Sequence, residues 1–457
     1  MSERRSLASA RYLSPEEAER LAKQTLSYVT TPDGARVNIN SGSRGNTRFA
    51  VNQVSTGGDN FDVTITVTAY AGRRSGTSST NRLDEAGLRQ AVTMAERLAK
   101  LAPEDPEFMP ELEPQQYEAG KGWSDTTAAL DPAGRAVAVR AVTAPASAAG
   151  LVSTGYLDAR AGSSAVSNSR GLFAYARSSA AALTTTVRTA DGSGSGWAGA
   201  AHHDWSRIDP AALGMRAAEK AKASRNPAAI EPGRYTVGFE PTAVANLVQF
   251  IAFALSARSA DEGRSFFSKA GGGNKIGSKV VDERVSLISD PFDDETPGSP
   301  FTNEGLPTRR NVWIENGVVK TLNYDRFWAQ KKGVAPSASA GVLRMSGGDS
   351  SIDAMIASTA RGLLVTRFWY LRPVDARTIL FTGLTRDGTF LIENGKISRA
   401  VKNLRFNDSP VFMLNNLEAL GTPARVSASE DGGPGQAVVV PPIKVRDFNF
   451  TSLSDAV

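Results

Sequence analysis

The chain has 457 residues, of which 41% are hydrophobic and 22% are charged, and both values are ordinary for a folded globular protein. Its 52 basic and 47 acidic residues leave a formal net charge of +5. These charges are mixed along the sequence, whereas a nucleic-acid-binding surface needs clustered lysines and arginines, so we expect no nucleic-acid partner.

The sequence has no cysteine, which excludes disulfides, zinc sites with thiolate ligands and a cysteine nucleophile. Its two histidines, His202 and His203, are neighbours, so they cannot give the helical two-histidine spacing of a zinc peptidase. The first 17 residues lack the apolar core of a signal peptide, and the longest apolar run, 247–255, is shorter than the ~20 residues that cross a bilayer. We therefore expect a soluble, cytoplasmic protein that has no membrane partner.

Residues 14–114 predict a small N-terminal α/β lobe. Ser14 begins a capping box with Pro15 at the first helical position, and Asp84 caps a second amphipathic helix. Between these helices, three stretches have strand composition: 35–41, 48–54 and 62–71. The Pro- and Glu-rich stretch 103–114 indicates a linker.

Residues 115–229 predict a middle region of helices and short strands. One helix begins at Asp131-Pro132, short strands follow over 151–188, and a second capped helix begins at Asp209-Pro210. The division between this region and its neighbours rests on composition and on Pro-rich junctions.

Residues 230–457 predict a larger, strand-rich C-terminal lobe. The segment 233–240 alternates as a strand, and Pro241 opens a helix whose following residues, 243–257, are almost wholly apolar, so we expect this helix to be buried, with Phe250 and Phe253 in the core. The pairs Asn316-Gly317 and Asn394-Gly395 predict two hairpins, because both positions of such turns need a positive φ. The whole order of elements predicts an α+β fold with two lobes.

Several of these segments together resemble the TldD/PmbA family, whose members were historically labelled modulators of DNA gyrase. The resemblance rests on the order of the stretches 48–54, 72–92, 166–175, 261–268, 304–320 and 363–370, and on the strand and helix over 233–257. In the catalytic TldD-type members, a His-Glu-x-x-x-His motif lies on this helix and a cysteine of a C-terminal loop completes the zinc site. Here the matching positions are Gln249, Phe250 and Ala254, and Asp431 stands where the cysteine would be, in the loop 431–436.

The resemblance therefore implies a PmbA (TldE)-type member with vestigial metal positions, no catalytic residue and no cofactor. It implies a partner subunit that pairs with a TldD-type metallopeptidase as a heterodimer, and a chamber in which that partner cuts unstructured peptides. Two alternatives stay open: a stand-alone homodimer that binds a peptide or small ligand, and a hydrolase with relocated, non-zinc chemistry based on carboxylates or Ser/Thr.

Four further segments have a functional and a structural interpretation. The sequence favours a solvated loop over a small metal site at His202-His203-Asp204, and a solvated turn over a calcium site at 290–295. It favours a mobile loop over a phosphate-binding loop at 269–275, because the Gly-Lys-Ser/Thr ending and the preceding strand are missing. It favours core and interface over a ligand-binding box at 367–370.

Overall fold

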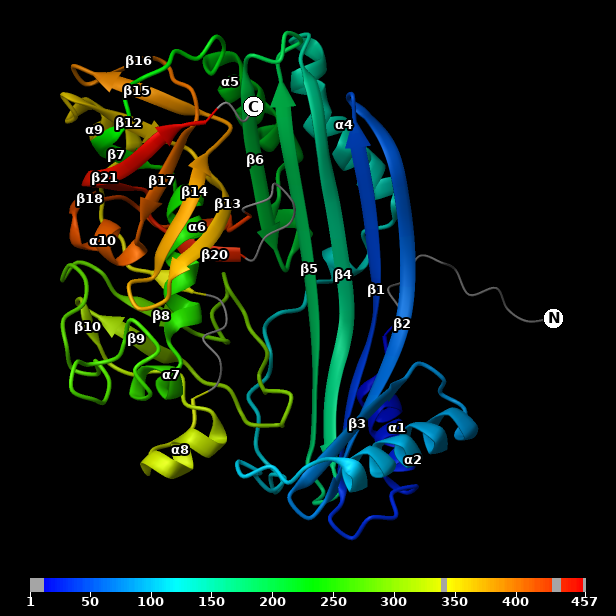
Figure 1. The fold of residues 1–457 in the computed structure, drawn as a ribbon. Coiled ribbons are helices and arrows are strands. Elements are labelled where there is room, and N and C mark those ends of the chain that lie inside the picture. Colours follow the sequence, from blue (N-terminus) through cyan, green and yellow to red (C-terminus); the bar gives the residue numbers. More distant parts are fainter. Residues whose placement is uncertain (1–11, 338–342, 430–436, 455–457) are drawn as a thin grey trace.

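The computed structural model describes residues 12–337, 343–429 and 437–454, and these residues form two lobes (Figure 1). The first lobe is built on one sheet of long strands, and the second, C-terminal lobe stands beside it. Helices and strands are interspersed in both lobes, so the predicted α+β class is confirmed.

The first lobe holds a six-stranded antiparallel sheet in the order β3-β2-β1-β4-β5-β6. The strands are β1 Ala35–Ala50, β2 Gln53–Ala71, β3 Arg74–Thr80, β4 Val152–Asn168, β5 Phe173–Arg188 and β6 Ser195–His202. Because β1 pairs with β4 along most of its length, strands of the predicted N-terminal lobe and of the predicted middle region share one sheet.

Helices cover one face of this sheet at both of its ends. They are α1 Pro15–Leu26, α2 Glu85–Leu101, α3 Asp125–Ala128, α4 Pro132–Ala148, the 3-10 turn η1 Trp205–Arg207 and α5 Pro210–Ala223. The apolar sides of α1 and α2 pack on Val37, Ile39 and Ile65 at one end, and α4 and α5 pack on Leu157 and Leu183 at the other. The predicted caps Ser14, Asp84, Asp131 and Asp209 are confirmed, since each accepts a hydrogen bond from the first turn of its helix.

The predicted strand over 48–54 is wrong, because this stretch contains a hairpin turn. β1 runs on to Ala50, β2 begins at Gln53, and Val51 and Asn52 between them have φ values of 52° and 62°. A turn of this kind usually carries glycine at one or both positions, and the absence of glycine concealed it in the sequence. Asn52 holds the turn to the sheet, since its side chain donates to Leu151 O at 2.9 Å and accepts from Ser153 N at 2.7 Å.

The C-terminal lobe contains two further sheets around one large apolar core. The larger sheet has the order β13-β14-β17-β21-β7-β12-β15-β16, with β18 paired to β21, and the smaller has the order β10-β9-β8-β11-β20-β19. The larger sheet comprises β7 Gly233–Phe239, β12 Arg361–Val365, β13 Phe368–Asp375, β14 Leu380–Thr385, β15 Thr389–Glu393, β16 Lys396–Ala400, β17 Leu404–Asp408, β18 Leu417–Leu420 and β21 Ile443–Leu453.

The smaller sheet comprises β8 Leu287–Ser289, β9 Asn311–Glu315, β10 Val318–Val319, β11 Arg344–Met345, β19 Ala424–Ser427 and β20 Ala437–Val440. The helices of this lobe are α6 Pro241–Ala254, α7 Ala257–Asp261, α8 Arg326–Lys332, α9 Ile352–Ala357 and α10 Pro410–Asn415. Both Asn-Gly hairpins are confirmed: they join β9 to β10 and β15 to β16, with positive φ at all four turn residues.

Polar contacts join the two lobes at several places. Lys220 on α5 forms an ion pair of 2.6 Å with Glu240, the N-cap of α6, and Arg425 on β19 donates to Ala201 O on β6 at 2.6 Å. Arg258 on α7 binds Glu107, in the stretch that follows α2, through two hydrogen bonds of 2.5 and 2.6 Å. Within the residues described, none of the helices combines the length and the hydrophobicity needed to span a membrane.

Candidate functional site

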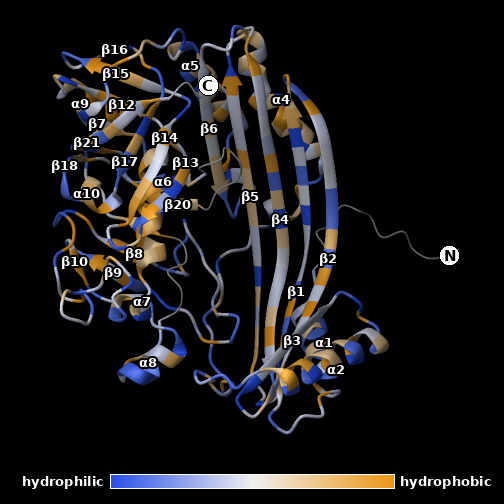
Figure 2. Ribbon diagram, in the orientation of Figure 1, coloured by the Kyte–Doolittle hydropathy of each residue, from blue (hydrophilic) through white to orange (hydrophobic). Residues whose placement is uncertain are grey.

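Helix α6 begins where the sequence predicts and lies largely inside the C-terminal lobe. Pro241 occupies its first turn, where no N–H is needed, and residues 243–248 together with Ile251 are buried. It packs against β7, β13, α10 and the strands β19 and β20. Figure 2 shows it as a hydrophobic ribbon within this lobe.

The three positions at which the resemblance expects the metal motif are occupied by side chains with other contacts. The side chain of Gln249 donates back to Asn246 O at 3.1 Å. The ring of Phe250 stacks on Phe381 of β14, with 3.8 Å between the ring centroids. Ala254 offers only a methyl group, and its carbonyl accepts from the Ser265 hydroxyl at 3.0 Å.

The prediction that the whole helix is buried is wrong for its last turns. Phe253 is 70% exposed, and Phe250 is only partly buried. The sequence is apolar on every side of the helix, so it shows no amphipathic period from which the exposed side could be predicted.

Asn246, inside the first half of α6, ties the helix to two other segments. Its amide donates to Ser429 O at 3.1 Å, and its Oδ1 accepts from the backbone N–H of Phe368 at 3.1 Å. The residue is completely buried, so these bonds satisfy a side chain that would otherwise destabilise the core. Asp431, the fourth predicted position, lies outside the described residues.

These donors do not fit a zinc or iron ion. A tetrahedral zinc site needs imidazole, thiolate or carboxylate ligands, whereas the three helix positions supply an amide that is already bonded, a phenyl ring and a methyl group. In the part of the chain that the structure describes, no group of three His, Asp or Glu side chains is placed to hold a metal ion.

The prediction of a solvated loop at 202–204 is wrong for His202, whereas His203 and Asp204 follow the strand in a bend and are partly buried. His202 is the last residue of β6 and only 8% exposed, and its ring stacks on that of His203 with 4.4 Å between centroids. Burial lowers the pKa of His202 to about 4, with the nearby Arg425 guanidinium acting in the same direction, and burial also lowers the pKa of His203. Both rings are therefore neutral at pH 7, and Nδ1 of His202 accepts from Asp204 N at 2.8 Å.

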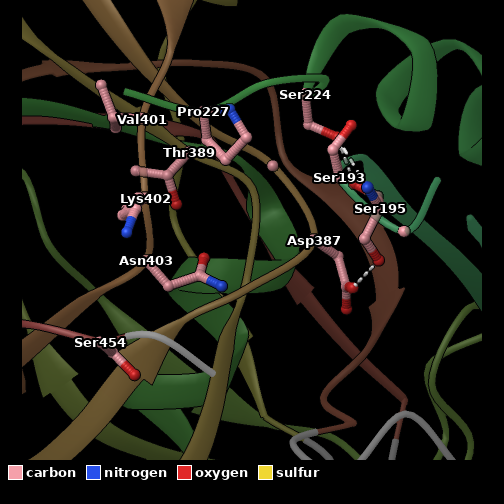
Figure 3. A pocket seen from close by; sticks show the side chains of 12 residues that line it. Ser193, Ser195, Ser224, Pro227, Asp387, Thr389, Val401, Lys402, Asn403 and Ser454 are labelled. Atoms are coloured by element: carbon pink, nitrogen blue, oxygen red, sulfur yellow. Dashed lines mark hydrogen bonds between the residues drawn. The ribbon is translucent and has the colours of Figure 1, made fainter. Parts of the chain in front are cut away.

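A pocket of about 230 Å³ lies between the lobes and brings serines close to a carboxylate (Figure 3). Ser193, Ser195 and Ser224 come from the first lobe, and the Ser195 hydroxyl donates to Asp387 of the C-terminal lobe. Asp387 also forms an ion pair with Arg367 at 3.3 Å. The histidines are at the opposite end of β6, so Ser195 has no imidazole base, and this pocket lacks the parts of a serine hydrolase.

Asp387 also lines a second interlobe pocket, of about 370 Å³. Val152, Thr154, Thr186 and Arg188 line it from the ends of β4 and β5, and Arg367, Trp369 and Arg386 line it from the C-terminal lobe. Arg386 lies over the Trp369 ring at 4.3 Å and Arg367 over the Trp197 ring at 4.7 Å. In the stretch 367–370, Phe368 belongs to the core, Arg367 and Trp369 line this interlobe pocket, and Tyr370 is 47% exposed.

For the two remaining loops, 290–295 and 269–275, the structure agrees with the structural interpretation. In 290–295, Asp293 accepts from the N–H groups of Glu295 and Thr296 and pairs with Arg344 at 3.0 Å, which is a turn with a surface ion pair. In 269–275, Gly271, Gly272 and Gly273 all have positive φ, and no strand precedes them.

Family models match three consecutive stretches of the chain. They are described as PmbA/TldA metallopeptidase domain 1 (residues 35–99), central domain (104–225) and C-terminal domain (232–452). The chain belongs to the PmbA/TldD family. The expected resemblance is thereby confirmed, and the domain that carries α6 matches the family's C-terminal domain.

Named relatives agree with this family. A metalloprotease of Methanothermobacter thermautotrophicus is 29% identical over 337 residues, which are 66% of this chain and 70% of that protein. A metalloprotease TldD homolog of Buchnera aphidicola is 28% identical over 162 residues, which are 32% of this chain and 33% of that protein. The solved structure of TldE from Thermococcus kodakarensis shares the fold, with a TM-score of 0.80 at 18% identity over 95% of this chain and 100% of that one.

Proposed function

We propose that this chain is the metal-free partner subunit of a heterodimeric PmbA/TldD-type peptidase. In this proposal a TldD-type subunit supplies the metal and the base, and this chain supplies one wall of a chamber that admits unstructured peptides. The chain itself has no catalytic role and needs no cofactor.

The observation that supports the proposal most directly is the chemistry of α6. α6 is the helix on which the resemblance expects the metal motif, but Gln249, Phe250 and Ala254 offer neither a metal ligand set nor a general base. Because Phe250 stacks on Phe381, the site is filled by packed apolar groups rather than left as an open polar cavity.

The two-lobed shape supports a wall function. The sheet face that carries no helices is turned toward the C-terminal lobe, since Thr154 and Thr186 share a pocket with Trp369, and Asn38 donates to Asn303 O at 2.8 Å. A closed chamber of this kind would exclude folded proteins by size and admit extended chains.

The test is an unstructured peptide incubated with this chain, with a TldD-type subunit from the same organism, and with both. We expect efficient cleavage only by the mixture, and we expect o-phenanthroline to abolish it. The chain purified without the partner should contain no stoichiometric zinc or iron after dialysis, which elemental analysis measures.

Three results would decide against the proposal. Chelator-resistant cleavage by this chain would favour the relocated, non-zinc chemistry. A stable homodimer that binds peptide and ignores the TldD-type subunit would favour the stand-alone binding protein. Close to one transition metal per chain would contradict the assignment of α6 as a vestigial helix.

A further inference from the structure

The helix-free face of the long sheet carries a charged cluster at its centre. Arg44 on β1 and Arg160 on β4 are direct cross-strand neighbours, and both bind the carboxylate of Asp158. Nε of Arg44 donates to one oxygen of Asp158 at 2.6 Å, and Nε of Arg160 donates to the other at 2.7 Å. Asp158 is only 4% exposed, so a buried carboxylate fixes two guanidinium groups side by side.

The outer edges of both guanidinium groups remain available to a ligand. The side chains of Arg44 and Arg160 are 49% and 56% exposed. Nη2 of Arg44 has a long contact of 3.4 Å to the Tyr156 hydroxyl. Among the described residues, Nη1 of Arg44 and both Nη atoms of Arg160 have no hydrogen-bond partner, and these paired donors match a carboxylate in geometry.

The cluster keeps a net positive charge. Two guanidinium groups share one carboxylate, and Arg48 adds a further charge on the same face, with its guanidinium 5.4 Å from the Tyr156 ring. The next carboxylate on this face, Asp62, lies opposite Gly42 and accepts from the Thr64 hydroxyl.

The cluster faces the space between the lobes. Side chains alternate between the two faces of a strand, so Arg44 and Arg48 share the face of Asn38, and Asp158 and Arg160 share the face of Thr154. Asn38 contacts the C-terminal lobe at one end of this face, and Thr154 contacts it at the other. At about 3.3 Å per residue, the cluster lies ~20 Å from the first contact and ~13 Å from the second.

We propose that Arg44 and Arg160, held by Asp158, form a subsite that binds a carboxylate of the peptide in the chamber, either an acidic side chain or the peptide C-terminus. This inference rests on the proposed function for the peptide as ligand. The subsite gives the non-catalytic subunit a part in substrate choice, because it favours peptides whose acidic group reaches this wall while the chain extends toward the partner.

The test measures binding of fluorescent peptides to the full chain by anisotropy. The probes are short peptides of glycine, serine and alanine that carry glutamate or glutamine at the same positions, each with a free or an amidated C-terminus. We expect the glutamate peptides to bind about tenfold more tightly than the glutamine peptides, with a difference that shrinks as salt rises. Comparison of the free and amidated ends shows which carboxylate is bound.

Two variants and one matched control connect this preference to the cluster. Arg160→Gln should remove most of the preference for glutamate peptides. The fold should be kept, because Arg44 still pairs with Asp158. If Arg160→Gln does not fold, Arg160→Lys keeps the ion pair but loses the paired donors, and should reduce the preference severalfold. Arg140→Gln makes the same charge change on an exposed residue of α4, on the opposite face, and should leave the preference unchanged.

Equal affinity for glutamate and glutamine peptides, or no binding of any peptide, would overturn the subsite. The subsite would also be overturned if Arg140→Gln lost as much of the preference for glutamate peptides as Arg160→Gln, since that would indicate only general charge attraction. Tighter binding of a single-stranded oligonucleotide at the same arginines would assign the cluster to phosphate instead. Failure of the mixture to cleave peptide concerns the proposed function and leaves this binding result intact.

Discussion

At the scale of single residues, the two phenylalanines of α6 should behave differently. Phe250→Ala removes a ring that stacks on Phe381 and is partly buried, so we expect a loss of about 2–3 kcal/mol in the free energy of unfolding. Phe253→Ala removes a ring that is 70% exposed, and alanine has the higher helix propensity, so the change should stay below about 0.5 kcal/mol. Urea unfolding of both variants measures the difference.

Equal losses for the two variants would mean that the ring of Phe253 is covered in solution, which a bound partner or a second copy would do. The comparison therefore also reports on association. Repeating it with the TldD-type subunit present separates the cost to the fold from the cost to the complex.

Residue identities in the sequence predicted part of the site and missed another part. That Gln249, Phe250 and Ala254 offer no metal ligand set follows from side-chain chemistry, which needs no coordinates. The cluster of Arg44, Asp158 and Arg160 could not be predicted, because Asp158 follows Arg44 by 114 positions and only the pairing of β1 with β4 brings the two together. The sequence of β1 alternates between polar and apolar residues only from Arg36 to Asn40, so it does not show which face Arg44 occupies.

At the scale of elements, the turn between β1 and β2 offers a test of local strain. Val51 is β-branched, has φ 52° and is 66% exposed, so its backbone is strained and its side chain buries little apolar surface. Val51→Asn should raise the free energy of unfolding by about 0.5–1 kcal/mol, because asparagine tolerates this conformation. Asn52→Ala should lower it by about 1–3 kcal/mol, because Leu151 O and Ser153 N lose their partner.

Urea unfolding measures both changes, with the dependence of the free energy of unfolding on urea concentration expected to be the same in each protein. A stabilisation by Asn52→Ala would contradict the role of this side chain as the link between the hairpin and β4. Val51→Ala, which keeps a positive φ but shortens the side chain, controls for the loss of apolar surface.

Elements whose signals are local were predictable, and elements that depend on distant pairing were not. Helix caps and Asn-Gly turns are set by a few neighbouring residues, which is why Ser14, Asp84 and Asn316-Gly317 were predicted correctly. The first half of β2 contains Gly57 and Gly58 and has no strand propensity of its own, yet both residues pair with β1. Sheet pairing thus overrides local preference along this hairpin.

At the scale of the whole molecule, the lobe junction should make stability depend on pH below neutrality. His202 is a buried neutral base between the lobes whose Nδ1 accepts from Asp204 N. Its neighbouring cations are Arg425 and Arg207, and its neighbouring carboxylates are Asp204 and Glu295. Its pKa is about 4 in the folded chain and near 6.5 in the unfolded chain. Between these values the unfolded chain binds the extra proton, so stability falls as the pH is lowered from 6.5 to 4, by up to ~3 kcal/mol.

The variant His202→Asn removes this titration while its amide oxygen can still accept from Asp204 N. Urea unfolding between pH 7 and pH 4.5 should therefore show a smaller loss of stability for the variant than for the natural chain. Some loss should remain in both proteins, because the pKa of His203 is also lowered by folding. The pKa of Asp204 is lowered chiefly by its hydrogen bond from Thr126. The stabilisation that its carboxylate gives the fold is therefore lost only below the ordinary pKa of an aspartate, which lies outside the range from pH 7 to pH 4.5. Parallel curves for the two proteins would show that His202 is as accessible to protons as in the unfolded chain, and that the lobes separate at this point in solution.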